Sequence, residues 1–104
     1  MRVAAAQMDI AWHDREQNYA RARRLAGKAK EVGATLFVLP EMFSTGFSMA
    51  SDITAEPLNG PTPSFLRSIA REMSMAVIGG FALFIVFEAG GHKHAIRCSR
   101  KRPW

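Results

Sequence analysis

The sequence predicts an α/β fold with a largely parallel sheet. Short apolar runs alternate with two stretches of helical spacing, which gives the order β-α-β-α-β over residues 1–83. The run Leu36–Leu39 is short and continuously apolar, a pattern typical of a strand covered on both faces. Pro40 lacks an amide proton and marks the end of that strand. We therefore expect Glu41 at the carboxyl end of a parallel strand, where open α/β sheets bind their ligands.

The first βαβ unit combines a strand, a capped helix and a glycine stop. Val3–Met8 is almost entirely apolar and predicts the first, central strand. Asp14, with a glutamine three residues later, predicts the start of a helix over Arg15–Val32. Gly33 ends this helix because glycine readily adopts the left-handed conformation. The apolar face of the helix comprises Ala22, Leu25, Ala26, Ala29 and Val32.

A loop, a second helix and a third strand are predicted after Glu41. Residues 42–55 show no clear period and predict a long loop, and such loops over strand ends usually carry function. Thr62, which precedes a proline, predicts the cap of a helix over Pro63–Ser74. Ala76–Ile78 predicts the third strand. The pair Gly79-Gly80 after it predicts a bulge or the close approach of another backbone segment.

Length and composition indicate one small domain or part of a larger one. The 104 residues are 48% hydrophobic and 22% charged, which is ordinary for a globular protein. The apolar stretch Met75–Phe87 is short and interrupted by glycine, so it is not expected to span a membrane. Gln7 and Asp9 fall where a secretory signal needs an apolar core. These two features predict a cytoplasmic protein. The single cysteine, Cys98, excludes an internal disulfide and is compatible with a reducing compartment.

Positive charge is concentrated at the end of the chain. Residues 1–83 carry nine Lys/Arg and eight Asp/Glu, whereas residues 84–104 carry five and one. Phe84–Phe87 is apolar enough for a strand, but residues 92–104 show no helical face, no alternation and no helix cap. The sequence therefore predicts a folded unit over 1–83 and a divergent basic tail over 84–104.

Four features together resemble the beginning of a nitrilase-superfamily carbon–nitrogen hydrolase. They are Val3-Ala-Ala-Ala-Gln7, the capped helix after Asp14, the third strand ending in Gly79-Gly80, and above all the segment Phe37-Val-Leu-Pro-Glu41-Met-Phe-Ser-Thr-Gly-Phe-Ser48. The residues after Glu41 are similar to the ω-amidase (2-oxoglutaramate amidase) branch, which deamidates small 2-oxo acid amides. The resemblance covers residues 1–83.

This resemblance implies a fold and a mechanism. The fold is an α-β-β-α sandwich, of which this chain would supply the N-terminal β-α-β-α-β portion, and the family usually assembles as a dimer. In the family, a cysteine thiolate attacks the amide carbon and a lysine stabilises the oxyanion. A glutamate takes the thiol proton and later activates water. Glu41 matches that glutamate and is the predicted catalytic residue, while no cofactor and no metal are expected.

The other two catalytic residues have no convincing counterpart. Lys101 lies near the expected distance for the family lysine, but its neighbours match poorly. Cys98 precedes Lys101 and lacks the strand-to-helix elbow of the family nucleophile. We therefore expect a truncated hydrolase that is inactive alone, with a tail consistent with a shifted reading frame. The expected partners are a small amide in the complete enzyme, and a second copy or a full-length relative that covers the exposed sheet.

Other interpretations stay open from the residues alone. Glu41 could be a structural carboxylate that caps a helix or forms an ion pair. His92, His94 and Cys98 carry the nitrogen and sulfur ligands that zinc prefers, although three ligands without a second cluster are a weak signal. A small non-enzymatic α/β module could also contact nucleic acid through its tail cations and Trp104, but nucleic acid is not the expected partner.

Overall fold

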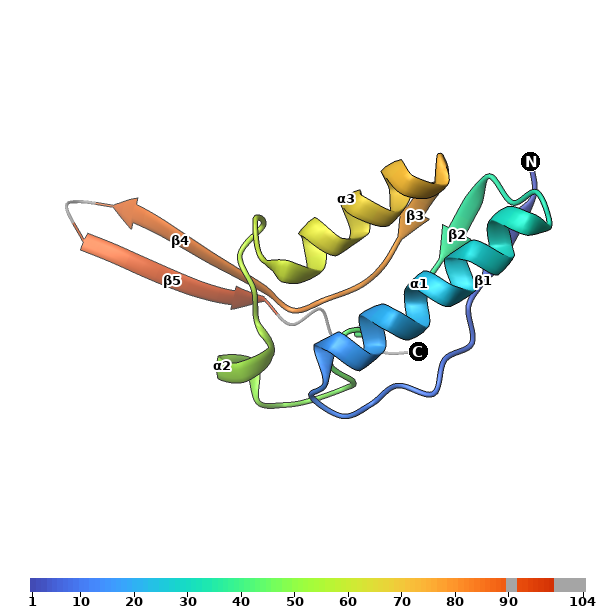
Figure 1. Cartoon of the computed structure of the whole chain (residues 1–104). Coiled ribbons are helices and arrows are strands. Elements are labelled where there is room, and N and C mark those ends of the chain that lie inside the picture. Colours follow the sequence, from blue (N-terminus) through green and yellow to red (C-terminus); the bar gives the residue numbers. More distant parts are fainter. Residues whose placement is uncertain (90–91, 99–104) are drawn as a thin grey trace.

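The computed structural model describes the backbone of residues 1–89 and 92–98 and the side chains of residues 1–83. Helices and strands alternate along the chain (Figure 1). The elements are β1 (Val3–Ala5), α1 (Arg15–Glu31), β2 (Leu36–Val38), α2 (Ser51–Thr54), α3 (Pro61–Met73), β3 (Ala76–Ile78), β4 (Leu83–Ala89) and β5 (His92–Cys98). Apart from the one-turn helix α2, the predicted β-α-β-α-β order over residues 1–83 is confirmed.

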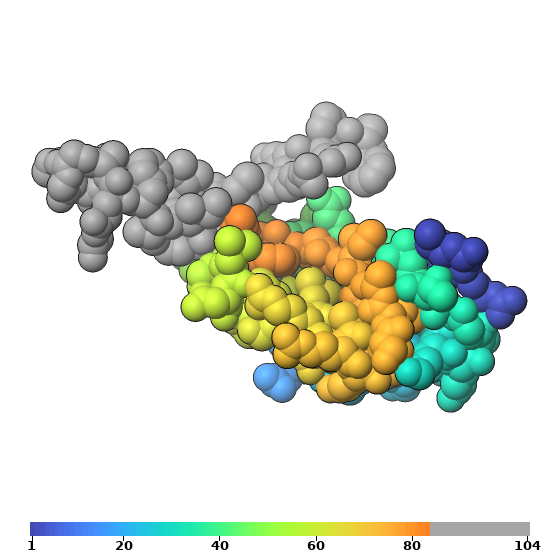
Figure 2. Space-filling view, turned by 90° about the horizontal axis from the view of Figure 1, so that it is seen from above, coloured from blue at the N-terminus to red at the C-terminus, as the bar shows by residue number. Residues whose placement is uncertain are grey.

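Strands β1, β2 and β3 form a parallel sheet in that order. Phe37 in the middle of β2 lies between Ala4 of β1 and Val77 of β3. Seen from above, turquoise residues near β2 lie between the dark blue N-terminus and the orange segment that contains β3 (Figure 2). The prediction that Val3–Met8 forms the central strand is wrong for the described sheet, because β2 is the strand that has a hydrogen-bonded neighbour on each side.

Helices α1 and α3 pack on one face of this sheet (Figure 1). Phe37 points to the helices and is only 1% exposed, and it joins a core with Phe65 and Ile69 of α3 and the buried alanines of α1. Leu36 and Val38 alternate to the opposite face and stay half-buried. Among the described side chains, helices cover the face that carries Phe37, and the expectation that β2 is covered on its second face as well stays a prediction.

Helix α1 begins where the sequence predicts. The Asp14 carboxylate accepts a hydrogen bond from the amide of Gln17 at 3.1 Å, and Gly33 beyond the helix has a φ of 79°. Val32, predicted on the buried face, is 57% exposed because it lies one residue past the last helical residue. The buried apolar positions of that face are Ala22, Ala26 and Ala29.

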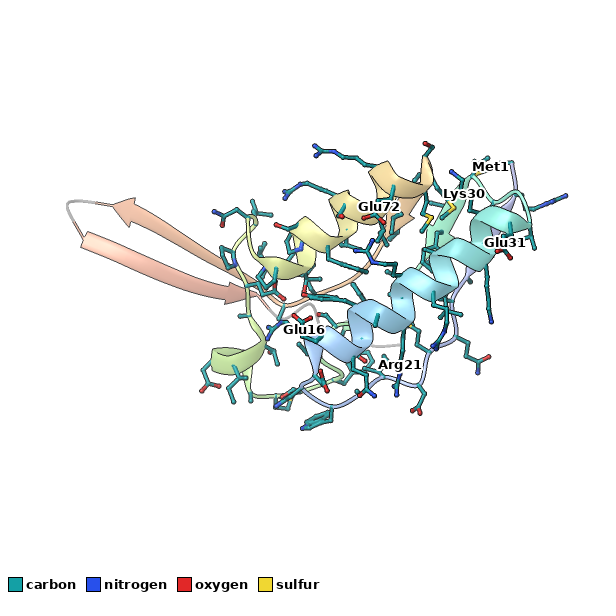
Figure 3. All side chains as sticks on the ribbon, in the orientation of Figure 1. Met1, Glu16, Arg21, Lys30, Glu31 and Glu72 are labelled. Atoms are coloured by element: carbon teal, nitrogen blue, oxygen red, sulfur yellow. The ribbon has the colours of Figure 1, made fainter. Side chains whose placement is uncertain are left out.

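Polar bonds also join α1 to α3. Arg23 of α1 forms an ion pair with Glu72 of α3, and this hydrogen bond lowers the pKa of the Glu72 carboxyl. Lys30 Nζ donates to the carbonyl of Met73 at 2.8 Å. Figure 3 labels Glu72 and Lys30 on the two helices. These two α1 cations therefore hold the helices together and are not part of a free basic surface.

Helix α3 begins two residues earlier than predicted. It starts at Pro61, with Gly60 as the N-cap residue, so Thr62 lies inside the first turn and is not the cap. The reason is tertiary: the carboxylate of Glu56 accepts a hydrogen bond from the amide of Thr62 at 2.6 Å and so fulfils the capping role. Ser74, predicted as the last helical residue, is the C-cap with a φ of 49°.

The segments predicted without regular structure are partly ordered. Residues 42–55 contain α2. Strand β4 confirms the strand expected around Phe84–Phe87, and it pairs antiparallel with β5 in a hairpin that extends away from the rest of the molecule (Figure 1). The aperiodic sequence of residues 92–98 forms β5 because β4 supplies its hydrogen-bond partners. Lys101 and Trp104 lie outside the described residues.

Candidate active site

Glu41 lies just past the carboxyl end of the central strand β2. The sheet hydrogen bonds continue beyond the assigned strands, since Leu39 N donates to Ile78 O at 2.8 Å and Ala6 N donates to Val38 O at 2.8 Å. The backbone that leads to Glu41 is therefore fixed on both sides. This confirms the predicted place of Glu41 at the carboxyl end of a parallel strand.

The Glu41 side chain is half-buried. Within the part of the chain whose side chains are described, its carboxylate forms neither an ion pair nor a hydrogen bond; the described ion pairs use Glu56 and Glu72. The alternative role of Glu41 as a helix cap or ion-pair partner thus finds no contact among these residues. A carboxylate without such bonds keeps its oxygen lone pairs free to accept a hydrogen bond or a proton from an external group.

Two glycines bring the end of β3 against Glu41. A Cβ on Gly80 would lie 3.3 Å from Glu41 Cγ and 3.4 Å from its Cα. A Cβ on Gly79 would lie 2.9 Å from both Phe43 Cε1 and Leu66 Cδ2, which is closer than real side chains approach. The close approach predicted for Gly79-Gly80 is therefore confirmed, and the segment approached is Glu41 with the aromatic ring two residues later.

The chain turns sharply after Glu41. Met42 has a φ of 54°, and its carbonyl accepts a hydrogen bond from the amide of Gly46 at 2.8 Å. Phe43, at the centre of this turn, is 0% exposed and lies in the hydrophobic core. A left-handed backbone at a non-glycine residue is strained, and such residues cluster at functional sites. Here the turn sends Phe43 into the core and leaves Glu41 at the end of the sheet.

Asn18 of α1 anchors this turn from behind. Its side chain is 0% exposed, and its Nδ2 donates to the carbonyl of Ser44 at 2.8 Å. The same amide group bonds the backbone N–H and C=O of Ala11, each at 2.8 Å. The sequence analysis missed this contact, although a polar residue four positions before Ala22 on a buried helical face is a signal that could have revealed it.

A second polar network, centred on Glu56, fixes the far end of the loop that follows Glu41. Glu56 is 3% exposed, and its carboxylate accepts hydrogen bonds from Arg15 Nε at 3.1 Å and from the amide and hydroxyl of Thr62. Arg15 also donates to the carbonyl of Thr54 at 3.0 Å. Helix α1 therefore holds both the end of the loop and the start of α3 through one buried ion pair.

Tyr19 completes the network. Its hydroxyl lies 2.7 Å from the hydroxyl oxygen of Thr62. Burial raises the pKa of Tyr19 above its ordinary value, although the hydrogen bond with Thr62 opposes that shift. The sequence analysis did not single out Glu56 or Tyr19, because the network joins α1 to residues about forty positions later and no spacing along the chain marks it.

The described site offers one accessible carboxylate on a rigid support, which is suited to accepting a proton. Among the described side chains, no group of three or more His, Cys, Asp or Glu residues could hold a metal ion. The side chains of His92, His94 and Cys98 lie outside that part, as does Lys101. The structure therefore leaves their relation to Glu41 untested.

The comparisons with known proteins agree on one family. The model of the family described as carbon-nitrogen hydrolase matches residues 2–96. The chain is similar to a nitrilase of Pyrococcus abyssi (strain GE5 / Orsay), with 32% identity over 87 residues that cover 79% of this chain and 33% of the relative. It is also similar to the hydrolase MT0498 of Mycobacterium tuberculosis (strain CDC 1551 / Oshkosh), with 35% identity over 80 residues that cover 77% of this chain and 28% of the relative.

A solved structure shows the same fold. XC1258 from Xanthomonas campestris, described as a CN-hydrolase superfamily protein with an arsenic adduct in its active site, has a TM-score of 0.58 and 24% identity. The likeness covers 93% of this chain and 40% of that one. It confirms that the chain forms a part of this fold.

The chain matches only part of each relative. It spans about a third of the length of the curated relatives, namely 33% and 28%. The family match continues past Leu83 to residue 96, and the boundary predicted at residue 83 stays a prediction. None of the described helices combines the length and apolarity required to cross a bilayer.

Proposed function

This chain belongs to the carbon–nitrogen hydrolase family, and we propose that it supplies the general base of an amide-hydrolysing site, Glu41. The observation that carries the proposal is the position of this carboxylate. It lies past the carboxyl end of the central parallel strand β2, and none of the described ion pairs involves it. Glu56, the other carboxylate near this loop, is instead buried and bonded to Arg15 and Thr62.

In this proposal, Glu41 takes the proton from a cysteine thiol while the sulfur attacks the amide carbon. The oxyanion that forms is stabilised by a lysine, and ammonia leaves with a proton returned by the base. Glu41 then takes a proton from water, which attacks the thioester carbon. The C–S bond breaks, the acid is released, and the proton returns from Glu41 to the cysteine sulfur. A base must keep its position through both steps. The contacts at Gly79, Gly80 and Met42 help to hold the Glu41 carboxylate in place.

The proposed substrates are small ω-amides of the 2-oxo acid type. The support for this choice is the segment Met42–Ser48, which resembles the ω-amidase branch and directly follows Glu41. Phe43 and Gly46 of this segment shape the turn after the base. This segment is therefore suited to setting the substrate preference next to the reacting carboxylate.

We further propose that the 104-residue chain does not hydrolyse amides alone. Its single cysteine, Cys98, precedes Lys101 and lacks the sequence expected around the family nucleophile. A base without its nucleophile cannot form the thioester. Purified chain incubated with 2-oxoglutaramate is expected to release no ammonia above the buffer rate. Turnover that disappears in Glu41→Ala would overturn this part of the proposal.

A hybrid enzyme tests the role of Glu41. Residues 1–83 would replace the matching N-terminal segment of the Pyrococcus abyssi nitrilase, and the hybrid would be assayed on the substrate of the parent. In an active hybrid, Glu41→Gln is expected to lower kcat by about 10²–10⁴-fold, the usual contribution of a general base.

The matched control for this hybrid is Glu31→Gln. Glu31 is an exposed carboxylate at the end of α1, and its loss is expected to leave kcat unchanged. Circular dichroism and the melting temperature of each variant separate lost chemistry from lost folding. If the Glu41→Gln hybrid keeps the rate of the unmutated hybrid, Glu41 is not the base.

A further inference from the structure

The turn after Glu41 contains one strained residue. Two residues of this turn have a left-handed backbone, Met42 with a φ of 54° and Gly46 with a φ of 82°. Glycine adopts this conformation freely because it has no Cβ, whereas a residue with a side chain adopts it at a cost in free energy. Met42 is bonded directly to Glu41, so a relaxation of its backbone would rotate the peptide group that joins it to the carboxylate-bearing residue.

Two hydrogen bonds from other segments hold this turn. The carbonyl of Ser44 accepts from Asn18 Nδ2 at 2.8 Å, and the carbonyl of Thr45 accepts from the backbone amide of His13 at 2.9 Å. Ser44 and Thr45 are each 1% exposed, so water has little access to replace either bond. A strained conformation persists only where surrounding contacts fix it, and these two bonds are such contacts for Met42.

Both contacts depend on Asn18. Its side chain is 0% exposed in α1 and also bonds the backbone N–H and C=O of Ala11, each at 2.8 Å. Ala11 lies two residues before His13, which donates to Thr45. Asn18 therefore acts on the turn directly at Ser44, and a second time through the segment 11–13.

We propose that Asn18 is a positioning residue for the base Glu41, which it keeps in place by holding Met42 in its strained conformation. The inference rests on the function proposed for Glu41 and extends it to α1. Without the Asn18 amide, Met42 relaxes to a backbone conformation that side chains prefer, and the Glu41 carboxylate moves away from Gly80. Asn18 touches no reacting atom, so it acts through the geometry of the turn.

Nuclear magnetic resonance on the purified 104-residue chain tests where Glu41 lies. A Cβ on Gly80 would lie 3.3 Å from Glu41 Cγ, so the α protons of Gly80 and the γ protons of Glu41 are close enough for a nuclear Overhauser effect. The Gly46 amide, bonded to Met42 O at 2.8 Å, reports on the turn through its hydrogen exchange. In Asn18→Ala, the Overhauser effect is expected to disappear and the Gly46 amide to exchange at least about tenfold faster, since a lost hydrogen bond opens the turn.

The double variant Asn18→Ala/Met42→Gly separates positioning from general packing. Glycine at position 42 adopts the left-handed conformation without strain, so the turn no longer needs Asn18 to hold it. The Overhauser effect between Gly80 and Glu41 is expected to return in the double variant, and the exchange of the Gly46 amide is expected to slow again. A loss of packing around Asn18 would not be repaired by the removal of a second side chain.

Ile69→Val is the control for a general loss of stability. Ile69 is 0% exposed in α3, and the loss of a methyl group weakens the core without removing a hydrogen bond of the turn. This variant is expected to keep the Overhauser effect, and urea unfolding measures the stability of each variant. If Asn18→Ala does not fold, Asn18→Asp is measured in its place. It keeps the size of the side chain and the acceptor for Ala11 N, and it lacks the amide that donates to Ser44 O.

The hybrid enzyme designed for Glu41 gives the catalytic measurement. In it, Asn18→Ala is expected to lower kcat by about 10–10²-fold with little change in KM, the effect of a small misplacement of a catalytic group. Adding Met42→Gly is expected to restore most of the rate. If Glu41→Gln lowers the rate and Asn18→Ala does not, the positioning role alone is wrong. If Glu41→Gln leaves the rate unchanged, the function proposed for Glu41 is wrong.

Two results on the 104-residue chain would also overturn the positioning role. One is a folded Asn18→Ala variant that keeps both the Overhauser effect and the exchange rate of the Gly46 amide. The other is a loss of the Overhauser effect that Met42→Gly does not reverse, because Asn18 would then act through packing alone. Neither result depends on the activity of Glu41, so the two proposals are tested separately.

Discussion

Glu41 and the two glycines beside it show how single residues determine the shape of the candidate site. Gly80 lets the chain after β3 pass within van der Waals distance of the Glu41 side chain, and Gly79 fits against Phe43 and Leu66. Neither glycine has a positive φ. Their role is therefore to leave space, and a side chain at either position would push on the residues that hold the base.

Gly79→Ala is expected to destabilise the protein by about 1–3 kcal/mol, the usual cost of overpacking a filled core. The new methyl group would meet Phe43 and Leu66 at 2.9 Å. Urea unfolding followed by circular dichroism measures the change. The control is Gly27→Ala within α1, where nothing lies within 4 Å of the added Cβ and a gain of up to about 1 kcal/mol is expected. Equal effects of the two substitutions would contradict this account of Gly79.

Tyr19 predicts a pH dependence. Its pKa is raised above 10.0 in the folded protein, chiefly by burial, so the folded state keeps its proton to a higher pH than the unfolded state does. The contribution of the protonated phenol to stability is thus complete below the unfolded pKa and is lost as the pH rises through the folded one.

Above about pH 10, the unfolding free energy of the unmodified protein is therefore expected to fall more steeply than that of Tyr19→Phe. Urea titrations of both proteins between about pH 8 and pH 11 measure the two slopes. The two proteins have the same other ionisable groups, so the contribution of those groups cancels in the comparison. Equal slopes in the two proteins would show that folding does not raise the pKa of Tyr19.

At the scale of elements, the two long helices and the loop after Glu41 are held by few contacts. Helix α3 lacks a side-chain cap of its own and receives Glu56 at its first turn. Glu56 also pairs with Arg15 at the start of α1, so one carboxylate fixes the relative position of two helix N-termini. The loop between Glu41 and Glu56 is then anchored at both ends, by Asn18 near its start and by Glu56 at its end.

Glu56→Gln is expected to cost about 2–3 kcal/mol of unfolding free energy, the range for hydrogen bonds to a charged group. The change removes the charge that Arg15 and the Thr62 amide bind while keeping the size of the side chain. Arg15 is one quarter exposed, at 25%, so water relieves part of the loss.

Urea unfolding measures this change, with Glu31→Gln as the exposed control. The control is expected to stay within about 0.5 kcal/mol of the unmodified protein. Hydrogen exchange offers a second measurement, because amides in the first turn of α3 should lose protection in Glu56→Gln only. A Glu56→Gln protein as stable as the control would show that Glu56 does not anchor the loop.

At the scale of the whole molecule, the described fold is one helical layer on one sheet. The relatives are about three times as long, since the chain covers 33% and 28% of them, and it covers 40% of the XC1258 chain. The face of the sheet opposite α1 and α3, which carries Leu36 and Val38, lies where a further layer would pack in the α-β-β-α sandwich expected from the sequence.

Much of the fold could be predicted from the sequence alone. The helix that starts after Asp14 and ends before Gly33, the strands around Phe37 and Val77, and the place of Glu41 all depend on residues that are adjacent or one helical turn apart. Such local patterns are set by backbone conformation and by hydrophobic periodicity, which the sequence displays directly. The segment from Phe37 to Ser48 also indicated the family that the comparisons confirm.

What only the tertiary structure decided involves residues that are far apart in the chain. The position of β1 at the edge, the capping of α3 by Glu56, the anchoring of Ser44 by Asn18 and the strand β5 all depend on a partner that a spacing pattern does not specify. The sequence by itself determined that a carboxylate stands at the end of a parallel strand in a carbon–nitrogen hydrolase fold. The tertiary structure decided what holds that carboxylate and which face of the sheet the helices cover, because packing and long-range hydrogen bonds select among arrangements that are equally compatible with local preferences.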